Sequence, residues 1–117
     1  MRHAGERQKA VWLAMSELFL DVDVDDVLAG VTDGMKTSGY SAQDLDLIMV
    51  DEVYPVCHWN LRSVAGVWAG FDPGWLYDRC AARAALPQWR KTPLRGLRRW
   101  GLRRLLPEWT TILATIR

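Results

Sequence analysis

Apolar residues recur three and four positions apart in one segment after another, and this spacing constrains the fold more than any other feature of the sequence. In the first such segment Val11, Trp12, Met15, Leu18 and Phe19 fall on one side of a helix predicted over residues 5–20. The strict alternation of apolar and polar residues that is typical of strands is nowhere sustained. We therefore expect an all-α fold.

Capping residues divide the chain into short helices. The second helix is expected to begin after Asp21 or Asp23 and to end at Gly39, and the third to begin at Ser41 and to run to about Tyr54. Proline marks the start of each later helix, so we expect them over residues 55–66, 73–85, 93–106 and 107–116. Asp72 is expected to cap the second of these and Thr92 the third. The prediction is a compact single-domain bundle of about six to seven short helices over residues 1–117.

Size and composition fit one soluble domain. A chain of 117 residues is long enough for a core, and its seven tryptophans are large packing anchors. No apolar run reaches the ~18 residues that span a bilayer, and the charged start does not resemble a secretory signal. We expect a cytoplasmic protein without a transmembrane segment, in which Cys57 and Cys80 stay reduced.

The charges are strongly polarised along the chain. Residues 1–78 carry 13 acidic and 5 basic side chains, whereas residues 79–117 carry 10 basic and 1 acidic. The two halves either neutralise each other or form two binding faces. The acidic face that we expect to bind a partner contains Asp21, Asp23, Asp25, Asp26, Asp33, Asp44 and Asp46. The alternative, basic face, on the helix side opposite Leu94, Leu97 and Trp100, contains Arg95, Arg98, Arg99 and Arg103.

Glu52 lies inside the apolar stripe of its predicted helix. A buried carboxylate is costly unless it is paired or hydrogen-bonded. We expect a buried structural group in which Glu52 binds Arg62, the Asn60 amide or backbone donors at the next helix start. The alternative is a small enzyme in which Glu52, His58 or Asp51 is a perturbed acid–base group in a cleft.

Other candidate chemistry is weak. Cys57 and the adjacent His58 point about 100° apart on a helix, too far for a nucleophile and its base, and the cysteines and histidines lack zinc-site spacing. The aspartate run beginning at Asp21 has Asp26 and Thr32 where a calcium loop needs glycine and glutamate. No GxSxG, P-loop, GxGxxG, HExxH or CxxC motif is present. We predict no catalytic residue, no metal site and no cofactor, and hence no enzyme.

Three segments carry a resemblance to a known group. They read VWLAMSELFLD at 11–21, DEVYPVCHWNL at 51–61 and AGVWAGF at 65–71 followed by WL at 75–76. Together they resemble a family of small uncharacterised bacterial proteins over about residues 8–80, and the arginine-rich helical tail of about 86–117 lies outside the resemblance. The family implies no mechanism. Small helical proteins of this kind are similar to immunity proteins that neutralise bacterial toxins, which is an analogy of size and fold.

The functional expectation follows from the charges and this analogy. We expect a stoichiometric protein-binding module, a bacterial immunity protein that neutralises a cognate cytosol-acting toxin by occluding its active site. The acidic face would then contact a basic toxin such as a nuclease. The alternative is a protein that binds nucleic acid or another anionic surface through the C-terminal arginine helix.

Overall fold

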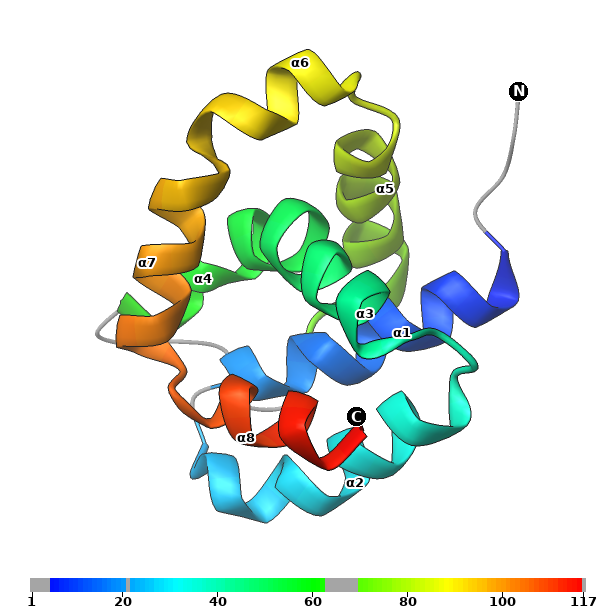
Figure 1. The fold of residues 1–117 in the computed structure, drawn as a ribbon. Helices are drawn as coiled ribbons and strands as arrows, with labels where there is room; N and C mark the ends of the chain where they lie inside the picture. The colour runs from blue at the N-terminus through cyan, green and yellow to red at the C-terminus, as the bar shows by residue number, and fades with distance from the viewer. Residues whose placement is uncertain (1–4, 21, 63–69, 117) are drawn as a thin grey trace.

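A computed structural model describes residues 5–20, 22–62 and 70–116, and within these ranges the chain contains helices and no strand (Figure 1). The helices are α1 (Glu6–Ser16), α2 (Val24–Thr37), α3 (Ala42–Ile48), α4 (Tyr54–Arg62), α5 (Pro73–Ala84), α6 (Gln88–Lys91), α7 (Arg95–Leu105) and α8 (Glu108–Ile116). Short 3-10 turns follow α1 and α6, and a π-helical turn, Met49–Val53, joins α3 to α4. The all-α prediction is confirmed.

Side-chain caps begin three helices where the sequence predicts them. Asp23 accepts a hydrogen bond from the Asp25 N–H at 3.0 Å at the start of α2, and Ser41 accepts one from Asp44 at 3.1 Å at the start of α3. Asp72 caps α5 ahead of Pro73. Gly39, just after α2, has a φ of 83°, a conformation that glycine adopts without strain.

Two predicted boundaries are wrong. Thr92 does not cap the basic helix, because the short helix α6 follows Pro87 and continues through a 3-10 turn into α7, which begins at Arg95. Pro55 lies in the first turn of α4 as predicted, but the π-helical turn leaves no break between α3 and α4. The predicted end of this helix near Gly66 lies outside the described residues.

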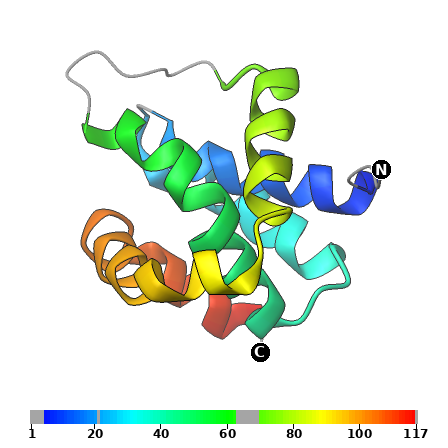
Figure 2. The same ribbon diagram turned by 90° about the horizontal axis from the view of Figure 1, so that it is seen from above.

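Residues 42–62 form one continuous helical rod through the middle of the molecule (Figures 1 and 2). Helices α1, α5 and α7 pack around its π-helical turn. From the rod, Leu45, Met49, Val53 and Cys57 are fully buried in the core. The rod therefore places the acidic residues of its π-helical turn where three other helices meet.

The C-terminal helix completes the core on another side. Helix α8 packs against α2 and α3, and it buries Trp109, Ile112 and Leu113. The arginine-rich tail is thus packed on the rest of the fold and contributes to its core.

Candidate interaction surfaces

Pro55 interrupts the hydrogen bonding of the central rod. In a regular α-helix the Val50 carbonyl would accept from the Tyr54 N–H, but that N–H donates to Met49 in the π-helical turn. Pro55 has no N–H to offer in its place. The Val50 carbonyl instead accepts from Arg98 Nε at 3.0 Å, so an arginine of α7 satisfies a backbone group that the proline leaves open.

Asp51, in the same turn, is enclosed by three arginines. Its carboxylate, with a side-chain exposure of 6%, accepts from Arg95 Nε at 3.0 Å and Nη2 at 2.6 Å, and from Arg98 Nη2 at 3.0 Å. Its backbone carbonyl accepts from Arg83 Nε at 3.0 Å. Burial alone would raise the pKa of Asp51, but the hydrogen bonds and charges of Arg95 and Arg98 outweigh it and hold that pKa below 3.8, its ordinary value.

Asp46 is engaged in the same way one turn earlier in the rod. Its carboxylate forms an ion pair with Arg99 and accepts a hydrogen bond from Trp109 Nε1 at 3.1 Å. It therefore joins α3 to α7 and α8. Residues of the same chain thus occupy the Asp46 carboxylate, and its membership of a partner-binding acidic face stays a prediction.

Three of the four arginines of the predicted basic face are engaged by carboxylates of the same chain. Arg95, Arg98 and Arg99 turn toward the carboxylates of the rod, because a buried carboxylate without a partner would be costly. Arg103 alone of the four is exposed. At this contact the acidic and basic halves of the chain neutralise each other.

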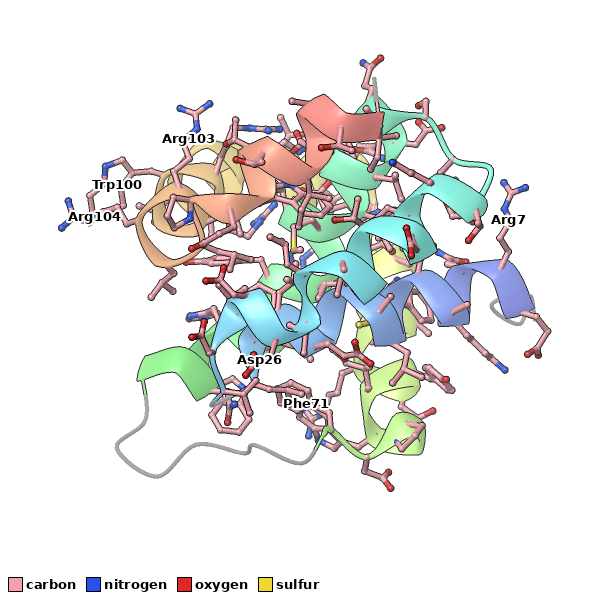
Figure 3. The ribbon with its side chains drawn as sticks, turned by 90° about the horizontal axis from the view of Figure 1, so that it is seen from below. Arg7, Asp26, Phe71, Trp100, Arg103 and Arg104 are labelled. Atoms are coloured by element: carbon pink, nitrogen blue, oxygen red, sulfur yellow. The ribbon has the colours of Figure 1, made fainter. Side chains whose placement is uncertain are left out.

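The inward arginines leave an apolar face of α7 pointing outward. Leu97 and Trp100 of α7 are 64% and 58% exposed, and Leu94, at the end of the 3-10 turn before α7, is 56% exposed. We call these three residues the α7 strip. The guanidinium of Arg104 lies 5.1 Å from the centre of the Trp100 ring. Figure 3 shows Trp100, Arg103 and Arg104 projecting away from the body of the molecule. The α7 strip is an apolar surface bordered by positive charge.

A second exposed surface lies on α2 and is acidic. Its aspartates are Asp23, Asp25, Asp26 and Asp33, which we call the α2 aspartates. None of them forms an ion pair with a residue that the structure describes. Asp44 is exposed in the first turn of α3, and Asp21 lies outside the described residues. Four of the seven predicted acidic residues are thus exposed on one helix and its cap.

Glu52 is partly buried and takes its donors from α1. Its Oε1 accepts from Trp12 Nε1 at 2.8 Å and lies 3.5 Å from Gln8 Nε2. Burial raises the pKa of Glu52 above its ordinary 4.5, although the Trp12 hydrogen bond partly opposes the shift. The indole N–H of a buried tryptophan needs an acceptor, and that requirement was a signal for this contact.

Of the two side chains that the sequence suggested as partners of Glu52, Asn60 and Arg62, only that of Asn60 is described, and it binds another group. The amide of Asn60, which is buried as predicted, donates to the Phe19 carbonyl at 2.7 Å and links the rod to the end of the first helix. The Arg62 side chain lies outside the described residues.

A cavity of about 350 Å³ opens beside Glu52. Its lining consists of Gln8, Tyr40, Asp44, Leu47, Ile48, Asp51, Glu52, Gln88, Lys91 and Arg95. The Lys91 ammonium lies buried at its wall and donates to the Ala84 carbonyl at 3.0 Å. Of the residues proposed for acid–base chemistry, Asp51 is held by arginines and His58 does not line this cavity. Of these three residues, Glu52 alone both lines the cavity and has a raised pKa.

Both cysteines are free and buried. Burial raises the pKa of the Cys57 thiol to about 12 and raises that of Cys80 as well, so neither is a ready nucleophile. Among the described residues, no three histidine, cysteine, aspartate or glutamate side chains are grouped so that they could hold a metal ion. No described helix is both long enough and apolar enough to cross a membrane.

Comparison with known proteins gives one match. A family model described as "Domain of unknown function (DUF7079)" matches residues 6–115. The match includes the arginine-rich tail, which the resemblance of the three sequence segments does not reach. No curated protein and no solved structure matches the chain.

Proposed function

The chain belongs to the DUF7079 family of domains of unknown function, and from this premise we propose that it is a non-enzymatic, stoichiometric protein-binding module. The specific form of the proposal is a bacterial immunity protein in the cytoplasm. It would bind a cognate toxin that acts there and occlude the toxin's active site.

The observation that carries the proposal is the set of unneutralised α2 aspartates. The carboxylates of the rod are occupied by arginines of α7, whereas the α2 aspartates have no cationic partner among the described residues. Lys36 is the only basic residue within α2. Such a surface is complementary to a basic protein, such as a nuclease, because opposite potentials speed encounter and set orientation.

The fold requires some of these carboxylates but not all. Asp23 caps α2, and Asp25 and Asp26 lie in the first turn, where negative charge stabilises the helix dipole. Asp33 lies beyond that turn and is exposed without an ion pair among described residues. Asp26 and Asp33 are seven residues apart, two turns of one helix face. Within the described part of the chain, the Asp33 side chain makes no hydrogen bond or ion pair that would explain its presence on structural grounds.

The first experiment identifies the partner. The tagged chain is used to capture proteins from the lysate of its own source, with and without nuclease treatment. The proposal expects one dominant protein that survives nuclease, in a stoichiometric complex. Recovery of nucleic acid, or loss of every partner on nuclease treatment, would instead support the alternative function, which would have to use Arg103 and Arg104 because the other arginines of α7 face inward.

The second experiment tests whether the α2 aspartates bind the partner. We expect the double change Asp26→Lys, Asp33→Lys to weaken binding of the captured partner at least about tenfold. The unfolding temperature should fall by only a few degrees, because Asp26 lies in the first turn of α2. The matched control is Glu6→Lys, Asp78→Lys, which reverses two exposed acids on α1 and α5. Equal affinity of wild type and the α2 variant would refute the proposal for this surface.

A further inference from the structure

We propose that the α7 strip docks on the surface of an anionic phospholipid bilayer, an interaction separate from the protein binding proposed for α2. The strip has no covering segment among the described residues, and its three side chains are each more than half exposed. Scattered single apolar residues on a surface are ordinary, whereas the largest contiguous apolar patch of a monomer, about 300–600 Å², is often a functional surface.

The arrangement is built into the fold. Rotating α7 by half a turn about its own axis would bury the strip, but it would also move the arginines away from Asp46 and Asp51. It would also bring Leu102, which is now buried, to the surface. The outward face is therefore fixed by contacts on the inward face, and it is presented as a rigid surface.

The charge around the strip selects an anionic occupant. Arg103 and Arg104 are exposed on α7, and residues 79–107 contain no aspartate or glutamate. Arg104 lies over Trp100, which pairs a cation with an amphipathic ring. A second copy of this chain would bring one basic border against another, so the charges disfavour pairing through the strip.

The shape and size of the strip favour a bilayer over an acidic protein. Helix α7 forms an outer edge of the molecule in Figures 1 and 2 and its labelled side chains project outward in Figure 3. The exposed area of the strip is on the order of a few hundred Å², whereas a specific protein complex buries roughly 800 Å² on each partner. Leucine and tryptophan with flanking arginine are the residues that helices lying in a bilayer interface present to lipid.

A second cation–aromatic pair stands immediately before α7. Trp89 of α6 is 74% exposed, and the guanidinium of Arg90 lies 6.0 Å from the centre of its ring. Tryptophan rings concentrate at the boundary between headgroups and acyl chains, and arginine beside them can contact phosphate. Helices α6 and α7 therefore each expose a tryptophan ring beside an arginine.

Vesicle flotation tests the proposal with the whole chain. We expect wild type to float with vesicles that mix phosphatidylglycerol and phosphatidylcholine, to float far less with phosphatidylcholine alone, and to dissociate as salt is raised. Leu97→Asp and Arg104→Glu should each reduce binding to the mixed vesicles about tenfold. Both changes lie on the exposed face, so circular dichroism should match wild type. The melting temperature of Arg104→Glu should fall by only a few degrees, because Arg104 lies in the last turn of α7.

Arg79→Glu is the matched control, because Arg79 is an exposed arginine of α5 whose guanidinium lies 5.7 Å from the Trp75 ring. It should bind the mixed vesicles as wild type does, and so should the Asp26, Asp33 double variant. Failure of wild type to prefer anionic vesicles, or equal binding by Leu97→Asp, would overturn the proposal. A dimer in lipid-free sedimentation that Leu97→Asp dissociates would also overturn it and assign the strip to a second copy.

Discussion

Asp51 and Asp46 place two carboxylates on the central rod where α7 crosses it, and their energetics explain the orientation of that helix. Removing the partner of a buried carboxylate costs about 3–5 kcal/mol. Burying Leu97 and Trp100 by turning the helix over would contribute about 2–3 kcal/mol each. The apolar side chains are already partly buried, so turning the helix over would contribute only part of that amount. The cost of leaving Asp51 without its arginines and the exposure of Leu102 both favour the observed orientation.

The substitution Asp51→Ala tests how much the contacts between Asp51 and its arginines stabilise the fold. The substitution leaves Arg95 and Arg98 partly buried without their carboxylate, so we expect the free energy of unfolding to fall by about 3 kcal/mol in urea denaturation. Asp44→Ala removes an exposed carboxylate seven residues earlier and should cost less than about 1 kcal/mol. Comparable losses in the two variants would contradict the role assigned to Asp51.

Glu52→Gln tests the pH dependence that follows from the raised pKa of Glu52. A raised pKa means that the folded chain holds the proton more tightly than the unfolded chain. The contribution of Glu52 to stability is therefore greatest when the pH is below 4.5, the ordinary pKa of glutamate. It declines as the pH rises through the pKa of Glu52 in the folded chain. Glutamine keeps an oxygen for Trp12 Nε1 but does not titrate, so Glu52→Gln should gain stability relative to wild type as pH rises.

The measurement is urea unfolding of both proteins at a series of pH values from about 4 to about 7. Leu97→Ala, a change at an exposed residue that does not titrate, is the control, and its stability difference from wild type should not change with pH. If the stability difference between Glu52→Gln and wild type stays constant with pH, or changes in the opposite direction, burial does not raise the pKa of Glu52.

At the scale of elements, the parts that depend on neighbouring residues were predictable. Asp23, Ser41 and Asp72 each cap the helix that the sequence assigns to them, because a cap acts on N–H groups two or three residues away. Pro55 shows the limit of such local rules. It was expected to start a separate helix, whereas Arg98, a residue from a distant helix, satisfies the Val50 carbonyl and the rod continues.

The orientation of α7 shows what local rules miss. Its pattern has two faces, one apolar and one rich in arginine, and periodicity alone favoured burying the apolar face. The structure buries the arginines because their partners lie in another element, and no local pattern reports that contact. The sequence did contain one signal: Leu102 and Leu106 interrupt the arginine side, and both are buried.

At the scale of the whole molecule, the tail makes the fold one unit. Helix α7 supplies the cations for the rod, and α8 supplies Trp109, Ile112 and Leu113 to the core. The family match to residues 6–115 includes both helices. Charge neutralisation within one chain thus leaves two exposed surfaces of different chemistry, the α2 aspartates and the α7 strip.

This dependence predicts that residues 1–86 do not fold without the tail. The truncated chain would expose the core face that α8 covers and would leave Asp46 and Asp51 without their arginines. We expect it to lose its cooperative thermal transition and its near-ultraviolet circular dichroism. Leu97→Ala in the full-length chain changes only an exposed residue of the tail and should keep both signals. A fragment 1–86 that melts cooperatively near the wild-type temperature would instead make the tail an appendage, and the orientation of α7 would then need another cause.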